Sequence, residues 1–356
     1  MQPTHITINE LVNLNPSQYL LIDVRSPAEY EHAYIPNAVN IPIFNNEERA
    51  TIGTAYKQQN RQVAIKLGLE SFGPNMVAII NQVQHFITTL HKPEGQQIIV
   101  HCWRGGMRSS AVAWLLNFYG FNATIVIGGY KQYRNWVLNQ FAIAYNFRVI
   151  SGNTGSGKTE VLEALNAMGE PIVNLEKLAG HKGSAFGNIE GIPQPSQEYF
   201  ENMLAHDLYN NKDKTIWIED ESQRIGHVNL PATLYAQKQN APHYILAIAF
   251  AERLNYITTQ YGKYPKQLLI DATLRITKRL GGLDAKNAID FLQDDDIQNG
   301  FEILLQYYDR VYTKALNKKT TPHNLHITLP CNTVNDKENA QKLLTIINPT
   351  TTQWNN

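Results

Sequence analysis

Short apolar runs alternate with helical patterns in the first third of the chain. The runs at residues 19–24, 97–100 and 124–127 are each followed by a polar or glycine-rich loop, which is typical of buried strands. Residues 77–90 and 109–119 place apolar side chains three and four positions apart, as the buried face of a helix does. Strands that alternate with helices predict an α/β fold with a parallel sheet, whose ligands bind at the carboxyl ends of the strands.

The same pattern begins again near residue 147. Residues 147–151 form an apolar run that enters a glycine-rich loop, and residues 159–168 have helical spacing. Further strands are expected at residues 171–175, 215–218, 244–250 and 268–270. The restart predicts two α/β domains, residues 1–136 and 137–356, joined by a helix at about residues 136–146.

The end of the chain is less informative. Residues from 320 onward show no clear pattern, and we expect residues 350–356 to be frayed.

Composition narrows the class of protein. A chain of 356 residues, 43% hydrophobic and 17% charged, is long enough for two folded domains. Its 31 basic and 31 acidic residues cancel, so any surface for nucleic acid must be local. The first ten residues are polar, and no apolar run approaches the roughly 18 to 20 residues needed to span a bilayer. With only Cys102 and Cys331 present, the sequence predicts a reduced, cytoplasmic protein without a membrane partner.

The loop after the second strand contains a candidate catalytic residue, Cys102. Gly105 and Gly106 allow a backbone whose N–H groups point inward, and such a nest before a helix stabilises a thiolate. Arg108 follows six residues after the cysteine, where it would cap a bound tetrahedral oxyanion. A buried cysteine in an ordinary strand-to-helix turn is the alternative. The candidate donor-binding residues of this loop are Trp103, Arg104, Gly105, Gly106, Met107, Arg108 and Ser109.

A second loop matches the complete phosphate-binding pattern G-x-x-x-x-G-K-[ST]. Its residues are Gly152, Asn153, Thr154, Gly155, Ser156, Gly157, Lys158 and Thr159. The backbone would cradle a diphosphate, with Lys158 on the outer phosphate and Thr159 available for Mg²⁺. Residues 216–221 end in acidic side chains, and Asp220 is a candidate acidic partner of the loop, although a solvated acidic turn gives the same pattern. No firm metal site is expected, and the motif does not require that the ligand be ATP.

Residues 4–136 resemble the rhodanese family. The resemblance rests on Asp23-Val24-Arg25, on the segments 35–38 and 40–42, on His101-Cys102 and on Gly128-Gly129. In that family the cysteine carries a sulfane sulfur as a persulfide. Asn37 replaces the usual glycine, a position that asparagine tolerates in left-handed turns. The C-x5-R loop is one residue longer than the common sulfur-carrying loop and resembles that of the rhodanese-like phosphatases, which suggests a larger ligand.

Nearly the whole chain resembles the tRNA 2-selenouridine synthase family. Besides the two loops, the resemblance rests on residues 175–187, 195–202, 219–222 and 279–282. It implies action on 2-thiouridine at the wobble position, U34, of tRNAs for Lys, Glu and Gln. The sulfur is first alkylated with geranyl diphosphate, and the geranylthio group is then replaced by selenium from selenophosphate. Cys102 would carry the selenium as an S-selanyl adduct, and Arg104 and Arg108 would hold the donor phosphate. The two donors are co-substrates, and no tightly bound cofactor is implied.

Several alternatives remain open at this stage. The segment 253–286 has seven basic and two acidic residues with Tyr256, Tyr261 and Tyr264 among them, which suits RNA but also fits a solvated helical face. A rhodanese-type tRNA sulfurtransferase, a C-x5-R phosphatase fused to an ATP-dependent kinase and a non-enzymatic RNA-binding adaptor are the competing functions.

Overall fold

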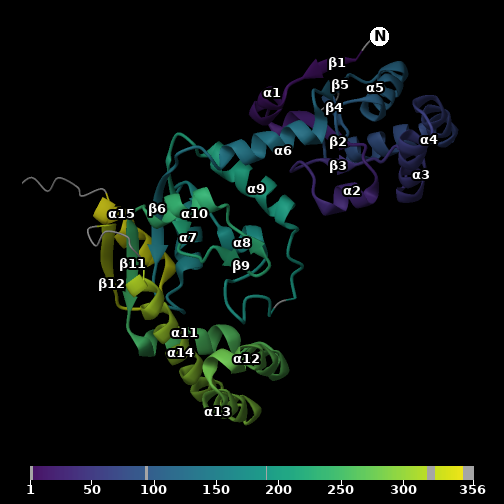
Figure 1. Ribbon diagram of the computed structural model, residues 1–356. Coiled ribbons are helices and arrows are strands. Elements are labelled where there is room, and N and C mark those ends of the chain that lie inside the picture. The colour runs from purple at the N-terminus through teal and green to yellow at the C-terminus, as the bar shows by residue number, and fades with distance from the viewer. Residues whose placement is uncertain (1–2, 93–94, 190, 319–324, 348–356) are drawn as a thin grey trace, which may run out of the picture. The chain divides into compact units, whose positions relative to one another are not determined.

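A computed structural model describes residues 3–92, 95–189, 191–318 and 325–347. The chain divides into two compact units, Met1–Gln140 with Glu201–Met203, and Phe141–Phe200 with Leu204–Asn356. Each unit contains a five-stranded sheet in which the paired strands run parallel (Figure 1). The α/β class expected from the sequence is confirmed.

The sheet of the first unit has the strand order β1-β5-β4-β2-β3. Apolar residues of β2, β4 and β5 form its core with helices α4 and α5. Because β4 is central and buried, it fixes the loop that begins at Cys102. The elements are β1 (Thr4–Ile6), α1 (Ile8–Asn13), β2 (Tyr19–Asp23), α2 (Pro27–His32), β3 (Val39–Asn40), α3 (Asn46–Gln58), α4 (Arg61–Thr89), β4 (Gln97–His101), α5 (Met107–Tyr119), β5 (Ala123–Val126) and α6 (Gly129–Gln140).

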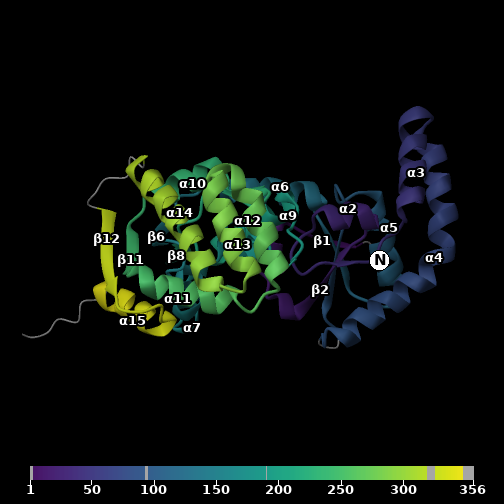
Figure 2. The ribbon, with the colours of Figure 1, turned by 90° about the horizontal axis from the view of Figure 1, so that it is seen from below.

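Helices α3 and α4 pack side by side as a hairpin (Figure 2). In the described part of the chain, α4 is the one helix long and apolar enough, by length and composition, to cross a membrane. An 18-residue window of α4 has a mean hydropathy of 1.3, and 17% of that window is buried. The sequence expectation concerned an unbroken apolar run, and α4 has none of this length, because Asn75, Asn81, Gln82 and Gln84 interrupt it; the window meets the criterion by its average hydropathy. Ile79, Ile80 and Val83 of α4 are buried in the core of the unit.

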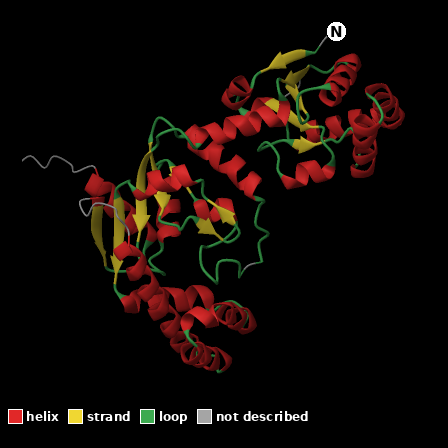
Figure 3. Ribbon diagram, in the orientation of Figure 1, coloured by secondary structure: helices red, strands yellow, loops and turns green. Residues whose placement is uncertain are grey.

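The sheet of the second unit has the order β12-β11-β6-β8-β7, so β6 is central. This strand leads into the phosphate-binding loop of residues 152–159, called the P-loop below. Helices α7 and α15 pack on this sheet, whereas α11 to α14 share a second apolar cluster that is almost entirely helical (Figure 3). The elements are β6 (Asn146–Ser151), α7 (Lys158–Ala167), β7 (Ile172–Val173), α8 (Leu175–Ala179), α9 (Gln197–Asn210), β8 (Thr215–Glu219), β9 (Arg224–Ile225), β10 (Val228–Asn229), α10 (Ala232–Gln239), β11 (His243–Ile248), α11 (Phe250–Tyr261), α12 (Lys266–Leu280), α13 (Gly282–Gln293), α14 (Ile297–Lys318), β12 (His326–Cys331) and α15 (Asp336–Ile347).

Three local expectations differ from the structure. The strand expected at 268–270 lies inside α12, because Leu269, Ile276 and Leu280 recur at helical spacing and are buried together. The helix expected at about 136–146 is the end of α6, which stops at Gln140. The region after residue 320 contains β12, an edge strand of the sheet, and α15. The tail expected to be frayed, residues 350–356, lies outside the described residues.

Candidate functional site

Cys102 follows strand β4 directly, at the start of the loop that leads into α5. It is 3% exposed, and its Sγ lies 3.3 Å from the Ser109 hydroxyl. Burial raises the pKa of the Cys102 thiol. Hydrogen bonds from the Ser109 side chain and the Arg104 backbone, with the charge of Arg108, lower this pKa by more, so the net shift is downward. The loop therefore favours the thiolate, which is the nucleophilic form.

Glycines fix the path of this loop. Gly105 has a φ of 64°, and a Cβ there would collide with the Val126 carbonyl oxygen. Gly129 has a φ of 56°, and a Cβ there would collide with the Cys102 carbonyl oxygen. That carbonyl also accepts a 2.8 Å hydrogen bond from the Tyr130 backbone N–H. The cysteine loop and the start of α6 are thus packed backbone against backbone. Asn37, which stands where rhodaneses have glycine, is left-handed as expected, with a φ of 68°.

Arg104 and Arg108, the two arginines expected to hold an oxyanion, have different surroundings: Arg104 is exposed, whereas Arg108 pairs with a carboxylate. Arg108 Nη1 donates to Glu29 Oε2 at 2.7 Å, and Arg49 Nε lies 3.5 Å from the same oxygen. Burial raises the pKa of Glu29, but its hydrogen bond and ion pair with Arg108 lower this pKa below the ordinary value. Arg108 is therefore held beside the thiol by a carboxylate. The loop side chains that are exposed are Trp103, Arg104 and Met107.

A buried charged network lies beneath the loop. Arg25 Nη2 is 2.5 Å from Asp23 Oδ2, and the Arg25 guanidinium lies 3.9 Å from the centre of the Tyr130 ring. His101 is paired with Asp23 in the sheet, its Nε2 is 3.8 Å from Asp23 Oδ2, and burial lowers its pKa. The network connects β2, β4 and α6 at the edge of the sheet where Cys102 lies.

The P-loop connects β6 to α7 in the second unit. Gly152, Gly155 and Gly157 have φ values of 154°, 80° and 72°, which favour glycine. Lys158 begins α7, and its Nζ donates to the Gly152 carbonyl at 3.3 Å. Since the loop precedes a helix N-terminus, its N–H groups form an anion site. The structure thus gathers the eight predicted residues into one strand–loop–helix.

Three glutamates lie near the P-loop: Glu176, Glu219 and Glu221. The Thr159 hydroxyl is 2.8 Å from Glu176 Oε2 and 3.3 Å from Glu219 Oε2. The Glu176 backbone N–H donates to Glu219 Oε1 at 2.7 Å. Burial, and then repulsion from neighbouring carboxylates, raises the pKa of Glu176 to about 7 and raises those of Glu219 and Glu221. The cluster therefore resists full ionisation near neutral pH.

At the end of β8 the carboxylate that contacts the P-loop residue Thr159 is that of Glu219, whereas the sequence suggested Asp220. The Asp220 carboxylate accepts hydrogen bonds from Ser151 Oγ at 3.0 Å and from Lys238 Nζ at 3.2 Å. Successive side chains of an extended chain face opposite sides. At the end of β8 this alternation turns Glu219 toward Thr159 and Asp220 toward the buried Lys238.

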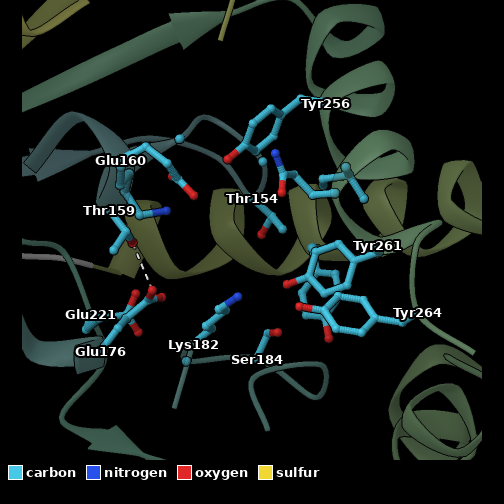
Figure 4. A pocket seen from close by; sticks show the side chains of 17 residues that line it. Thr154, Thr159, Glu160, Glu176, Lys182, Ser184, Glu221, Tyr256, Tyr261 and Tyr264 are labelled. Atoms are coloured by element: carbon cyan, nitrogen blue, oxygen red, sulfur yellow. Dashed lines mark hydrogen bonds between the residues drawn. The ribbon is translucent and has the colours of Figure 1, made fainter. Parts of the chain in front are cut away.

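A cavity of about 240 Å³ opens beside the P-loop. Figure 4 shows Tyr261 and Tyr264 on one side of it and Glu176 and Glu221 on the other, with Lys182 between them. The tyrosines that line the cavity are Tyr256, Tyr261, Tyr264 and Tyr308.

Three of these tyrosines belong to the segment that the sequence suggested for RNA. Arg253, in the same segment, is 4% exposed and donates to Asp309 at 2.7 Å, so this arginine stabilises the fold. The topology explains why these tyrosines lie near the P-loop: α11 begins at the carboxyl end of β11, and β11 is next to β6. Within residues 3–92, 95–189, 191–318 and 325–347, no group of three or more His, Cys, Asp or Glu side chains is arranged to hold a metal ion.

Comparisons with known proteins agree with the division into two domains. A family model described as tRNA 2-selenouridine synthase AAA domain matches residues 145–328, and one described as Rhodanese-like domain matches residues 7–135. The chain is 37% identical over 268 residues to the tRNA 2-selenouridine synthase of Nitrosomonas europaea, covering 73% of this chain and 68% of that protein. It is 32% identical over 371 residues to the protein of the same name from Bdellovibrio bacteriovorus, covering 90% and 94% of the two chains. The chain therefore belongs to the tRNA 2-selenouridine synthase family.

Proposed function

We propose that this protein converts 2-thiouridine at position U34 of tRNA into 2-selenouridine in two steps, geranylation of the sulfur and its replacement by selenium. The proposal is supported by family membership and by the presence of two different sites in one chain. The proposal rests on one observation: the same chain contains a buried thiol of lowered pKa in a glycine-containing loop and a P-loop at the start of a helix, which is a typical binding site for diphosphate. Because thiols stay reduced in the cytoplasm, we place this reaction there.

The P-loop cavity would bind geranyl diphosphate. The loop N–H groups and Lys158 would stabilise the departing diphosphate, and the tyrosine wall suits both an isoprenoid chain and positive charge developing on an allylic carbon. Mg²⁺ fits the oxygen donors of Thr159, Glu176 and Glu219, since it is commonly held by one or two carboxylates and substrate phosphates. When bound it would neutralise diphosphate charge.

The Cys102 loop would carry out selenation. The Cys102 thiolate would attack the selenium of selenophosphate, so that an S–Se bond forms as the Se–P bond breaks and its electron pair leaves on phosphorus, as phosphite. Cys102 would then hold the selenium as an S-selanyl adduct, which divides one difficult transfer into two. Arg104, exposed at the loop, is suited to the donor phosphate, and Arg108 supports the thiolate. The tRNA substrates would be those for Lys, Glu and Gln. Arg275, Lys278, Arg279 and Lys286 of α12 and α13 are exposed and suit contact with the RNA backbone.

The test is mass analysis of nucleosides after incubation of the protein with tRNA containing 2-thiouridine. Geranyl diphosphate alone should give S-geranyl-2-thiouridine, and addition of selenophosphate should give 2-selenouridine. Neither product should require ATP hydrolysis. Formation of inorganic phosphate from ATP or from a phosphorylated substrate, with unchanged tRNA, would instead support the phosphatase–kinase alternative.

A further inference from the structure

A second cavity, of about 580 Å³, lies entirely within the first unit, between the α3–α4 hairpin and the Cys102 loop. This volume is within the range of about 300–1,000 Å³ that is usual for small-molecule pockets. Cys102 itself lines the cavity, so a ligand bound there has one end next to the thiol. The P-loop contributes no residue to this cavity.

The walls of this cavity, called the groove below, are mostly apolar, and several of the side chains that line it are exposed. Tyr56 is 56% exposed, Leu69 60% and Met107 52%, and all three line the groove. Small residues create the space: Gly53 of α3 and Gly68 of α4 both line it, and a Cβ on Gly68 would lie 3.3 Å from Phe44 Cζ. Apolar side chains gathered around a hollow next to a reactive atom indicate a ligand with a hydrocarbon part.

The charged side chains around the groove specify the rest of that ligand. Arg49, Lys57, Arg104 and Arg108 line it, and none of the described residues that line it is acidic. Glu29, which pairs with Arg49 and Arg108, offsets part of this charge, and a net positive charge remains with Lys57 and Arg104. The occupant should therefore combine an apolar chain with a negatively charged body, and its reactive carbon should lie near Cys102. A wobble base that bears a ten-carbon chain on its sulfur, within an anticodon loop, has all three properties.

We infer that the groove between the α3–α4 hairpin and the Cys102 loop binds the geranyl chain of S-geranylated tRNA during selenation; this rests on the function proposed above. The outer selenium of the S-selanyl adduct on Cys102 attacks C2 of the base, so that a C–Se bond forms as the C–S bond breaks. The electron pair of the broken bond goes to sulfur, which takes a proton and leaves as geranylthiol in the groove. The selenium is then still bonded to Cys102 Sγ. A thiol reductant, present in every assay, attacks Sγ and breaks the S–Se bond with its electron pair on selenium, which releases 2-selenouridine, and a second thiol reduces the mixed disulfide left on Cys102. The geranyl group then acts as a handle, because each buried methylene strengthens binding about fourfold.

The experiment starts from purified tRNA that is already geranylated, so that the first step is not needed. Initial rates of 2-selenouridine formation are measured against tRNA concentration for the full-length wild type and for two variants. Gly68→Leu fills the groove with a residue that favours helices, and Leu69→Ala removes an exposed wall residue. Leu138→Ala is the matched control, since Leu138 is also an exposed helical leucine of the first unit and does not line the groove.

We expect both groove variants to raise KM for geranylated tRNA about tenfold or more, with less effect on a substrate carrying a five-carbon dimethylallyl chain. Geranylation from geranyl diphosphate and the selenium-dependent mass increase of the protein should match wild type, as should all properties of Leu138→Ala. Wild-type KM values for both substrates in both variants would overturn the inference. So would loss of geranylation with normal selenation of the preformed substrate, which would assign the groove to the first step.

Two further results distinguish failure of this inference from failure of the proposed function, and from binding of α4 to a membrane. If the wild type itself fails to selenate geranylated tRNA, the proposed function fails and the groove assignment falls with it. If the wild type sediments with phosphatidylglycerol vesicles, and Leu69→Ala does not while keeping the wild-type KM, the groove is a membrane contact and the inference is wrong.

Discussion

Burial and hydrogen bonding shift the pKa of the Cys102 thiol in opposite directions. Burial alone would raise the pKa of the thiol, but the Ser109 hydroxyl and the surrounding loop lower it. The other cysteine, Cys331, is also buried, and there burial raises the pKa without a comparable loop to oppose it. The two cysteines of the chain are therefore both buried but have pKa values shifted in opposite directions, so Cys331 serves as a control for Cys102.

We predict that Cys102→Ser abolishes 2-selenouridine formation and leaves geranylated tRNA to accumulate, because it removes the proposed selenium carrier and little volume. Nucleoside mass analysis measures both products, and circular dichroism checks the fold. Cys331→Ser should make 2-selenouridine at the wild-type rate. Normal selenation by Cys102→Ser would refute the role given to this thiol.

Lys158 is the cation closest in sequence to the P-loop glycines, and its ammonium lies over the loop at the Gly152 carbonyl. We predict that Lys158→Ala slows geranylation by about a hundredfold or more, since one contact to a leaving group commonly contributes a few kcal/mol to the transition state. Single-turnover rates with geranyl diphosphate measure this. Lys214 is an exposed lysine of the same unit, and Lys214→Ala should geranylate tRNA at the wild-type rate. An unchanged rate for Lys158→Ala would show that the P-loop binds something other than geranyl diphosphate.

At the scale of elements, the sequence predicted the two loops better than their surroundings. Both loops depend on local chemistry, glycines with positive φ and a helix start, and this is visible in consecutive residues. The choice between Glu219 and Asp220 depends on which side of β8 faces the P-loop, which a neighbouring strand decides. The groove depends on Gly53 and Gly68, which come together only after α3 folds back on α4. Neither relation could be predicted without the tertiary structure.

The glutamates at the end of β8 and the start of α8 should make stability depend on pH. The pKa of Glu176 is about 7 in the folded protein against an ordinary 4.5, so the folded state holds a proton that the unfolded state has released. Stability should therefore fall as the pH rises through this window, by roughly 3 kcal/mol for the full shift. Thermal unfolding between pH 4.5 and 7 measures the fall, and Glu176→Gln should make it shallower, with the remaining slope due to Glu219 and Glu221.

Two variants serve as references for this pH dependence. Glu47 is exposed, and Glu47→Gln should leave the curve unchanged. The pKa of Glu29 is lowered in the folded state, so its ionised form stabilises the protein above the ordinary value and this contribution is lost as the pH falls. Glu29→Gln should therefore lower stability at neutral pH. A Glu176→Gln curve as steep as that of the wild type would contradict the pKa assignment.

At the scale of the whole molecule, each unit has its own parallel sheet, its own apolar core and its own site. If geranylated tRNA leaves the protein between steps, the two activities can be supplied by different molecules. We predict that a mixture of full-length Cys102→Ser and Lys158→Ala restores 2-selenouridine formation, although neither makes it alone. The product is measured by nucleoside mass analysis with both donors present. A mixture as inactive as its components would show that both sites must act within one molecule.

The hydroxyl of Thr159 carries a single hydrogen, yet it faces carboxylate oxygens of both Glu176 and Glu219. It can donate to one of them at a time, and the raised pKa values indicate that the pair keeps an extra proton near neutrality. A cation that takes these oxygens must expel that proton, so loading of Mg²⁺ with geranyl diphosphate should acidify the solution. The heat measured by titration calorimetry would then differ between phosphate and Tris buffers by the ionisation heat of the buffer, and Glu176→Gln would reduce this difference.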